Sequence, residues 1–377
     1  MMDYKLELSK IIDKNYEDLK EEVKLLNSRL NNAKHICLFG AGSMGIDTAY
    51  YLNSKTIKID CFCDNNSKIW GENICLNIPC ISPSQLQHYK NGLLIIISSS
   101  YYSEIIKQLE ENALYNYLVF PMFLYLRIKD YIASCNVKTL KDNIYNLISI
   151  LEDKESIETL VSIIKKWFNP INSFYEINVL HKSNGKQYFP SDIIKLTSKE
   201  VFIDVGAYNG DTMREFLDAT NKYFSNIIAY ELDKNNFGKL QKEIQKYEPV
   251  IKNKIISYNM GLFDKNMLIK YSSNTTSGSI NDKSETIGKV VALSNHLTNL
   301  LPTYIKMDIE GAELDALIGA EEIIKRCKPK LAVCVYHNPE HFWQIPFYIK
   351  RLAPEYRIYL RHHSLDITET VCYAVIQ

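Results

Sequence analysis

Acidic residues stand at or near the ends of three apolar segments in the second half of the chain. Asp204 lies in the segment VFIDV, Glu231 directly follows NIIAY, and Asp308 directly follows TYIKM. In open sheets of parallel strands, the carboxyl ends of neighbouring strands meet at one edge, and ligands bind there. Carboxylates at this edge can accept hydrogen bonds from hydroxyl or ammonium groups. The three positions therefore predict a binding site at the strand ends of a parallel sheet.

A loop with two glycines follows the first of these segments. Its sequence, GAYNGDT, begins at Gly206, and its second glycine is Gly210. Glycines let a backbone approach a ligand closely, and the helix expected after the loop offers free N–H groups to an anion. Asp204 would suit an ammonium group, directly or through water, and the carboxylate of Glu231 can accept both hydroxyls of a ribose. A ligand that combines carboxylate, ammonium and ribose is S-adenosylmethionine, which we expect as the cofactor.

Lys306 interrupts an apolar segment that is otherwise typical of a central parallel strand. On a strand with period two, its side chain shares a face with Asp308. Because burying a lone ammonium is costly, we expect Lys306 to pair with a carboxylate near the strand end. This pair either pins the strand, or belongs to a site where Asp308 and Glu310 contact cofactor or substrate.

A reaction that removes a proton from a bound acceptor requires the protein to position the acceptor and to offer a base. The candidates for a catalytic role are Asp308, Glu310 and His337, which directly follows LAVCVY. A histidine at a strand end can equally be structural. Asp308 and Glu310 could instead hold Mg²⁺, but no third ligand is evident, so we predict no metal site. Another polar cluster either binds an acidic or phosphorylated acceptor or forms a solvated turn: Arg361, His362 and His363.

The second half of the chain, from about Leu151 to Gln377, resembles FkbM-family methyltransferases. The resemblance rests on six ordered segments: QYF (187–189), EVFIDVGAYNGDTMREF (200–216), AYELD (229–233), NMGLFD (259–264), IKMDIEGAELDALIGA (305–320) and CVYHNPEHFWQIPFYIKRLAPEYRIYLRHHS (334–364). It implies a class I methyltransferase fold that uses S-adenosylmethionine to methylate a hydroxyl, often on a sugar or secondary metabolite. Leu232 departs from the family, in which Pro commonly follows the ribose-binding acid.

Residue types and the resemblance together indicate the cofactor site. We expect the following residues to contact S-adenosylmethionine: Asp204, Gly206, Ala207, Tyr208, Gly210, Thr212, Glu231, Leu232, Asn259, Met260, Gly261 and Asp308. The expected reaction is O-methylation of a sugar or sugar-linked group in surface or flagellar glycan biosynthesis, with N-methylation of a glycan-linked amine as the alternative. A nicotinamide-dependent oxidoreductase and a non-catalytic scaffold are rival interpretations.

The first half of the chain contains a second glycine loop. Gly40, Gly42 and Gly45 follow the apolar segment HICLF, and Asp64 follows the next strand-like segment. This context favours binding of a dinucleotide or a nucleotide sugar, although such glycines can also serve only the tight packing of a helix on a strand. The stretch FCDNNSKIWGENICLNIPCISPSQL resembles nucleotide-binding domains that precede sugar acyltransferases in bacterial glycan pathways. The expected partner is a sugar or nucleotide-linked acceptor.

Hydrophobic periodicity divides the chain into four regions. We expect a helix over residues 1–33. Its apolar residues recur at alternating spacings of four and three positions, which suits either a coiled-coil homodimer or docking on the same chain. Strand–helix alternation predicts a Rossmann-like nucleotide-binding-type domain over 34–130, followed by a helical connector over 131–198. Residues 199–377 predict a seven-stranded methyltransferase sheet with an antiparallel terminal strand pair. The fold class is therefore α/β, with two Rossmann-like domains.

Composition excludes several functional classes for this chain of 377 residues. Lys plus Arg and Asp plus Glu both number 44, so the basic excess typical of nucleic-acid binding is missing. The longest apolar stretch, Tyr117 to Leu126, is far shorter than the ~20 residues of a membrane-spanning helix, and no secretory signal is evident. The nine cysteines include no CxxC pair, which fits reduced thiols. We therefore expect a cytoplasmic enzyme with no nucleic-acid partner and no membrane span.

Overall fold

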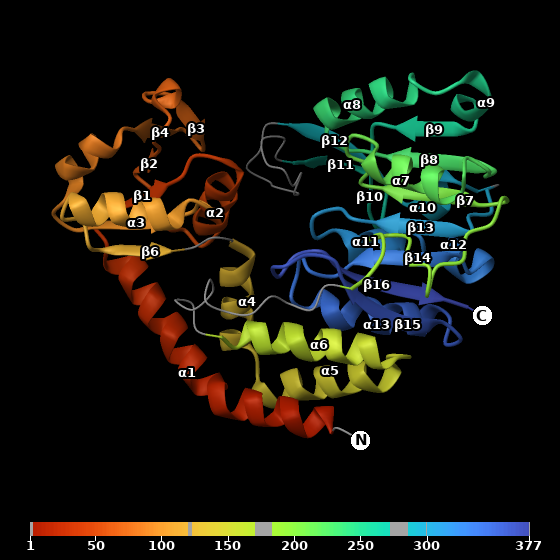
Figure 1. Cartoon of the computed structure of the whole chain (residues 1–377), viewed down its shortest axis with the longest axis horizontal. Coiled ribbons are helices and arrows are strands. Elements are labelled where there is room, and N and C mark those ends of the chain that lie inside the picture. The colour runs from red at the N-terminus through yellow and green to blue at the C-terminus, as the bar shows by residue number, and fades with distance from the viewer. Residues whose placement is uncertain (1–2, 120–122, 170–182, 272–285, 299, 377) are drawn as a thin grey trace.

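The computed structural model of the chain describes residues 3–119, 123–169, 183–271, 286–298 and 300–376. Two α/β units are joined by a group of helices (Figure 1). The amino-terminal unit holds a six-stranded sheet, and the carboxyl-terminal unit holds a seven-stranded sheet. The predicted α/β class with two Rossmann-like units is confirmed.

The amino-terminal sheet has the strand order β3-β4-β2-β1-β5-β6. Its strands are β1 (His35–Phe39), β2 (Cys61–Cys63), β3 (Asn73–Cys75), β4 (Ile78–Ile81), β5 (Leu93–Ile97) and β6 (Tyr117–Val119). Its helices are α2 (Ser43–Ser54), α3 (Tyr102–Glu111) and the 3₁₀ segments Ser67–Ile69 and Pro83–Tyr89. The central strands are apolar and buried, as expected of parallel strands covered on both faces. Periodicity does not predict β3 and β4, because each is too short to show a pattern.

Four helices form the group between the sheets: α1 (Tyr4–Asn32), α4 (Phe123–Ser134), α5 (Val137–Ile150) and α6 (Lys154–Trp167). The side chain of Asp3 caps α1 by accepting a hydrogen bond from the N–H of Leu6. α1 packs on α4, α5 and α6. Its buried residues are Leu8, Ile12, Tyr16, Leu19, Val23, Leu26 and Leu30. The apolar face of α1, which was expected either to form a homodimer or to dock on the same chain, is therefore covered by α4, α5 and α6. Among the described residues, this face is not exposed to a second copy.

The carboxyl-terminal sheet has the order β15-β16-β14-β13-β7-β8-β9. Its strands are β7 (Val201–Val205), β8 (Asn226–Tyr230), β9 (Ile255–Tyr258), β13 (Tyr304–Met307), β14 (Lys330–Cys334), β15 (Arg357–His362) and β16 (Thr370–Val375). Its helices are α7 (Asp211–Ala219), α8 (Lys234–Ile244), α9 (Pro249–Lys252), α10 (Leu293–His296), α11 (Glu313–Gly319), α12 (Glu321–Cys327) and α13 (His341–Leu352). β16 runs antiparallel to both of its neighbours, which confirms the predicted terminal pair.

A second, three-stranded sheet lies beside the main one and is not predicted by the alternation pattern. It consists of β10 (Gly261–Leu262), β11 (Met267–Lys270) and β12 (Ile287–Val291), with β12 in the middle. The helical group is attached to the opposite edge of the main sheet, where Leu151 forms a parallel bridge with Ile358 of β15. Residues 170–182 of the predicted connector and Gln377 lie outside the described residues, and the four-region division stays a prediction.

Within the part of the chain that the structure describes, every helix is too short or too polar to span a membrane. All nine cysteines are free thiols, and seven of them are buried.

Two leucines of α1 differ in burial, and this difference tests how the helix packs. Leu19 is 2% exposed and Leu25 is 64% exposed. We expect Leu19→Ala to lower the free energy of unfolding by about 2–5 kcal/mol, because a buried cavity is created. Leu25→Ala, the matched control, should change it by less than about 0.5 kcal/mol. Urea denaturation at two protein concentrations measures both. A midpoint that rises with protein concentration would instead indicate a dimer held by this helix.

Candidate functional site

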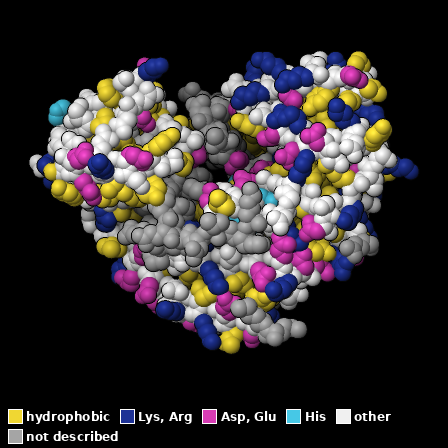
Figure 2. All heavy atoms as spheres, viewed as in Figure 1, with side chains coloured by type: hydrophobic (Ala, Val, Ile, Leu, Met, Phe, Trp, Pro, Cys, Tyr) yellow, Lys and Arg dark blue, Asp and Glu magenta, His cyan; other side chains and the backbone are white. Residues whose placement is uncertain are grey.

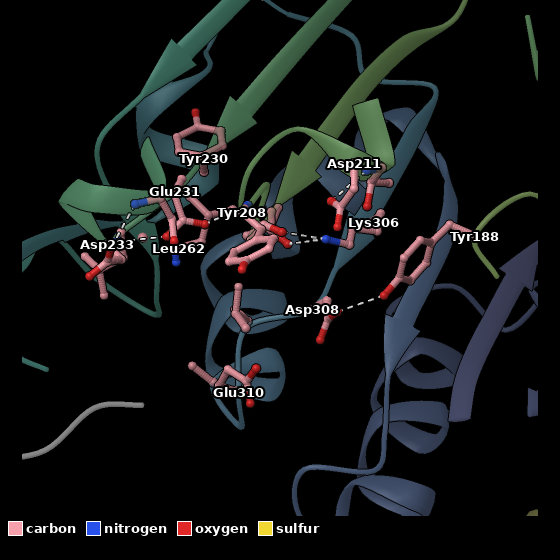
Figure 3. A pocket seen from close by; sticks show the side chains of 18 of the residues that line it. Tyr188, Tyr208, Asp211, Tyr230, Glu231, Asp233, Leu262, Lys306, Asp308 and Glu310 are labelled. Atoms are coloured by element: carbon pink, nitrogen blue, oxygen red, sulfur yellow. Dashed lines mark hydrogen bonds between the residues drawn. The ribbon is translucent and has the colours of Figure 1, made fainter. Parts of the chain in front are cut away.

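A cavity of about 480 Å³ lies at the carboxyl ends of β7, β8 and β13. Figure 3 shows Glu231 on one side of it, Asp308 and Tyr188 on the other, and Tyr208 between them. Neighbouring parallel strands place their last residues at one edge, so the loops that follow them surround a common space. The volume falls within the range of small-molecule pockets, roughly 300–1,000 Å³.

The loop after β7 is shaped by two glycines with left-handed backbone conformations. Gly206 has φ +78° and Gly210 has φ +85°, values that L side chains rarely adopt. A Cβ on Gly206 would lie 1.9 Å from the carbonyl oxygen of Asp308, so the loop contacts the end of β13 directly. Gly210 is the N-cap of α7 and provides no capping side chain. The cavity therefore has a tightly packed floor beside the uncapped start of a helix.

Glu231, directly after β8, is anchored by the backbone of this loop. One carboxylate oxygen accepts a hydrogen bond from the N–H of Tyr208 at 2.8 Å, and the other accepts one from the N–H of Asp233 at 2.8 Å. Burial raises the pKa of Glu231 to about 7, against the effect of these two donors. Each oxygen keeps a lone pair for a further donor, so the carboxylate can still accept the two hydroxyls of a ribose.

Asp204 and Lys306 form a buried ion pair beneath the cavity. They are register partners on β7 and β13, and the Lys306 Nζ lies 3.1 Å from the Asp204 Oδ1. The same ammonium donates to the carbonyl oxygens of Gly206 at 2.7 Å and Val205 at 3.3 Å. Burial alone would lower the pKa of Lys306, but Asp204 and then Asp308 raise it, so the side chain is charged. Lys306 lines the cavity and Asp204 does not.

This geometry corrects the predicted role of Asp204. Its side chain is fully buried and points to the ammonium of Lys306, so it is not available to the ammonium group of a ligand. The expectation that Lys306 pairs with a carboxylate near the strand end agrees with the structure, and its partner is the residue beside it on the neighbouring strand.

Asp308, the residue after β13, has one hydrogen-bonded and one unpaired oxygen at the cavity. Oδ2 accepts a hydrogen bond from the hydroxyl of Tyr188 at 2.8 Å. Oδ1 is buried, has no hydrogen-bond partner among the described residues, and lies 3.6 Å from the Nε2 of His337. Tyr188 precedes the sheet and follows no strand, so reasoning from strand ends misses it. The segment QYF in the family resemblance is the signal that could have found it.

His337 lies in a ring of carboxylates beside Asp308. Its Nδ1 is 2.8 Å from Glu313, and its Nε2 is 3.2 Å from Glu310. Burial alone would lower the pKa of His337, but Glu313 and Glu310 together outweigh burial and raise it well above its ordinary value. Burial would raise the pKa of Glu313, but His337 and His341 hold it well below its ordinary range. His337 is therefore a histidinium, which has no free lone pair with which to act as a base.

The same cluster supplies possible metal ligands that strand-end reasoning does not find. Asp308, Glu313 and His337 each offer a ligand atom, and these atoms lie within 4.8 Å of one another. Both ring nitrogens of His337 face carboxylates, however, which is the arrangement of a charged ion pair. Three such ligand atoms in one place could also hold a cation, so the absence of a metal site stays a prediction and is tested below.

Comparison with known proteins now identifies this part of the chain. A family model described as Methyltransferase FkbM domain matches residues 204–364. Residues 204–364 form an FkbM methyltransferase domain. Such domains use S-adenosylmethionine as methyl donor, so the oxidoreductase and scaffold interpretations are set aside. A second model, described as C2185-like, N-terminal, matches residues 32–120.

One solved structure agrees with this assignment at the level of the fold, and two others are reported as weaker similarities. The methyltransferase FkbM from Methylobacillus flagellatus KT is 20% identical with a TM-score of 0.67, and the match covers 99% of both chains. An rRNA methylase from Streptococcus thermophilus matches 48% of this chain and 90% of its own at 14% identity and TM-score 0.32. Fibrillarin from Aeropyrum pernix, bound to S-adenosyl-L-methionine, matches 50% and 73% at 11% identity and TM-score 0.31. Comparison with curated proteins returned no match.

The methyltransferase cavity fits S-adenosylmethionine in volume and in chemistry. It offers the Glu231 carboxylate for the ribose and the start of α7, where Gly210 provides no capping side chain, for the carboxylate of the ligand. One N–H of this first turn, that of Thr212, already donates to the Asp211 carboxylate at 2.8 Å. Of the expected cofactor contacts, those that line the cavity are Gly206, Tyr208, Thr212, Glu231, Leu232, Gly261 and Asp308. Four of the expected contacts are not among the lining residues: Ala207, Gly210, Asn259 and Met260. The Asn259 amide donates to the carbonyl oxygens of Glu231 and Leu232 at 2.9 and 3.0 Å. Further lining residues that sequence reasoning missed include Asp211, Asp233, Leu262 and Glu369.

The polar cluster on β15 has a structural role. Arg361 is 3% exposed and pairs with Asp153 at 2.6 Å and Asp192 at 2.8 Å. His362 and His363 are buried as well, and a ring nitrogen of His363 lies 2.9 Å from the hydroxyl of Tyr373. Both predicted alternatives, an acceptor site and a solvated turn, are therefore wrong. The charged side chains instead attach the helical group to the edge of the sheet.

A second, larger cavity of about 1380 Å³ separates the methyltransferase domain from the amino-terminal unit. Figure 2 shows it as a hollow between two lobes, with acidic side chains along its wall. Its wall includes residues of α2 and α4 on one side and the loops after β13 and β14 on the other. Ile309, Glu310 and Ala312 line both this cleft and the cofactor cavity. The two spaces therefore share a wall immediately beside Asp308.

The ion pair beneath the cavity makes a prediction about stability. Lys306→Met should lower the free energy of unfolding by about 3–5 kcal/mol, because it leaves the Asp204 carboxylate buried without its partner. The double variant Asp204→Leu/Lys306→Met removes both charges and should recover most of this loss. Urea denaturation of the three proteins gives the comparison. Equal stability of the single variant and the unchanged protein would show that the pair does not hold the strands.

The pKa of Glu231 predicts how cofactor binding depends on pH. Ribose hydroxyls donate to the carboxylate form, so affinity for S-adenosylhomocysteine should rise as pH increases through about 7. One pH unit below that pKa, binding should be about tenfold weaker than at high pH. Glu231→Gln should bind weakly at all pH values and lose this dependence. Isothermal titration between pH 5.5 and 8.5 measures both proteins, and parallel pH profiles would contradict the assignment.

Proposed function

We propose that the methyltransferase domain methylates a hydroxyl oxygen of a sugar or sugar-linked group in surface or flagellar glycan biosynthesis, in the cytoplasm. One observation carries the proposal: the cofactor cavity and the large cleft share the wall formed by Ile309, Glu310 and Ala312. A methyl donor in the first space and an acceptor in the second can meet only there, next to the unpaired oxygen of Asp308.

The chemistry of the cleft favours an acceptor with many hydroxyl groups. Asp47 and Tyr51 of α2 and Arg127 of α4 face it from the amino-terminal side, and Glu310 faces it from the methyltransferase domain. Burial and then the charge of Glu310 raise the pKa of Asp47 to about 7, so these two carboxyl groups interact across the space. Donors and acceptors on opposite walls are what a sugar needs to be held in one orientation.

Asp308 is the residue that can take up the proton of the acceptor. Its Oδ1 is unpaired, while the Tyr188 hydroxyl holds Oδ2 and fixes the orientation of the carboxylate. When bound, S-adenosylmethionine would supply an electrophilic methyl group on its sulfonium and leave as a neutral thioether. Asp308 would accept the proton that the acceptor hydroxyl loses. The protein thus contributes alignment and a base.

His337 balances the negative charge around this base. The histidinium lies 3.2 Å from Glu310 and 3.6 Å from Asp308 through its Nε2. Glu313, fully buried, holds the ring from its other nitrogen. His337 is therefore assigned as a positioning residue for the two carboxylates that face the acceptor.

The acceptor class is tested with S-adenosylmethionine labelled in the methyl group. The full chain is incubated with a panel of sugars, nucleotide sugars and amino sugars, and the products are analysed by mass spectrometry. We expect label in an ether oxygen position of a sugar. Label on an amine nitrogen would favour the N-methylation alternative, and label on neither class would reject the proposal.

Substitution of Asp308 tests the assigned base. Asp308→Asn should lower kcat by about 10²–10⁴-fold, because general-base catalysis contributes on that order. Affinity for S-adenosylhomocysteine should be retained, since Glu231 is untouched. Asp142→Asn, an exposed position on α5, is the control and should retain full activity. If EDTA abolishes turnover and Mg²⁺ restores it, then the cluster around Asp308 holds a metal and the assignment of a free carboxylate base is wrong.

A further inference from the structure

The amino-terminal unit has its own cavity, of about 530 Å³, at the carboxyl ends of β1, β2 and β5. Residues that line it include Gly40, Gly42, Asp64 and the serines 98–100 that follow β5. Gly45, the third predicted glycine, does not line it. The position is the edge of a parallel sheet at which loops from neighbouring strands meet, as at the cofactor cavity of the methyltransferase domain.

The three glycines of this loop are present for different reasons. Gly40 has φ +114°, and a Cβ there would lie 2.6 Å from the carbonyl oxygen of Ser98. A Cβ on Gly45 would lie 1.8 Å from the carbonyl oxygen of Gly40. Close packing explains these two positions. Gly42 has an ordinary φ of −78°, and a Cβ there would meet nothing within 4 Å. Packing therefore does not explain Gly42, whereas close approach of a ligand to the backbone does.

Asp64 repeats the arrangement of Glu231 in the other domain. Its Oδ2 accepts a hydrogen bond from the N–H of Ala41 at 2.8 Å, and its Oδ1 accepts one from the N–H of Asn66 at 2.8 Å. In both domains, the carboxylate after the second strand thus accepts a hydrogen bond from the loop after the first strand. It accepts another from the backbone N–H of the residue two positions after the acid itself. Since Glu231 presents its carboxylate to a nucleoside, the same arrangement at Asp64 favours a nucleoside.

The start of α2 and a buried serine provide for phosphate groups. α2 is 12 residues long, and its N-cap, Gly42, leaves the first N–H groups without a capping side chain. Ser98 lines the cavity, is 2% exposed, and its hydroxyl has no hydrogen-bond partner among the described residues. A buried hydroxyl without a partner is costly, so it points to a polar ligand group in this cavity.

The cavity continues towards the site of methyl transfer. Ser43 and Met44, at the start of α2, line both this cavity and the large cleft. The cleft in turn shares Glu310 with the cofactor cavity. Three spaces therefore follow one another, from Asp64 past the start of α2 and through the cleft to Asp308. A molecule with a nucleoside, phosphates and a sugar in that order would occupy the first two and present its sugar to the third.

We propose that the amino-terminal cavity binds the nucleoside diphosphate part of a nucleotide-linked sugar, and that this anchor presents the sugar to the methyltransferase domain. The inference deepens the proposed function and rests on it for the identity of the acceptor. Asp64 binds the ribose, the start of α2 and Ser98 bind the diphosphate, and Gly42 lets the diphosphate approach the backbone.

The binding site is tested on the full chain by isothermal titration with UDP, GDP, CDP, ADP and dTDP. We expect at least one of them to bind, and Gly42→Leu to weaken the binding of that nucleotide by about tenfold or more. Gly42 lines the cavity, and a Cβ added there meets no protein atom within 4 Å, so a larger side chain competes with the nucleotide for this space. Gly238→Leu is the matched control, because Gly238 of α8 also has nothing within 4 Å of an added Cβ. Both variants should keep wild-type affinity for S-adenosylhomocysteine. Absence of binding by all five nucleotides, or equal binding by Gly42→Leu, would overturn the inference.

A second measurement separates this inference from the proposed function. For the sugar linked to the nucleotide that binds, Gly42→Leu should lower kcat/KM mainly through KM, whereas Gly238→Leu should leave kcat/KM unchanged. If the free sugar and the nucleotide-linked sugar are methylated with the same kcat/KM, the proposed function stands and the nucleotide anchor is rejected. Nucleotide binding that Gly42→Leu abolishes, without methylation of any sugar, would support the site and reject the proposed acceptor.

Discussion

The buried ion pair between Lys306 and Asp204 is the interaction on which the methyltransferase site depends. It joins the two central strands directly below the cavity, and the same ammonium binds the carbonyl oxygens of Val205 and Gly206. The glycine loop is thereby fixed at its first residue, and through it the donors that hold Glu231. An ion pair of this kind adds little net stability compared with apolar residues, but it specifies one arrangement of strands and loop.

Charge is distributed around the site so that one carboxylate oxygen remains available. Lys306 is matched by Asp204, and His337 is matched by Glu313, both pairs being buried. Asp308 lies between these pairs, with the Tyr188 hydroxyl on one oxygen and no hydrogen bond on the other. A carboxylate that is oriented on one oxygen and free of hydrogen bonds on the other suits the proton transfer proposed for it.

Strand ends were the most predictable part of the molecule, because apolar runs followed by acids and glycines mark the functional edge of a parallel sheet. Glu231 and Asp308 lie at one cavity for this reason. Asp204 was misjudged, since a sequence shows that an acid is near a strand end but not that a neighbouring strand places an ammonium against it. Tyr188 enters from a segment outside the sheet, and such long-range contacts leave no local periodicity. The short strands of the three-stranded sheet leave none either.

Glycine loops show why a motif alone is weak evidence and why its geometry is stronger. Gly206 and Gly40 are required because a Cβ would strike a backbone carbonyl of a neighbouring strand end, so their presence reports the packing of a Rossmann-like turn and nothing about ligands. Gly42 faces open space in a cavity that adjoins the cleft, so close packing does not require a glycine there, and the proposed nucleotide gives it a role. In our proposal the two domains use the same edge of the same kind of sheet, one for the methyl donor and the other to anchor the acceptor, with the cleft between them as the meeting place.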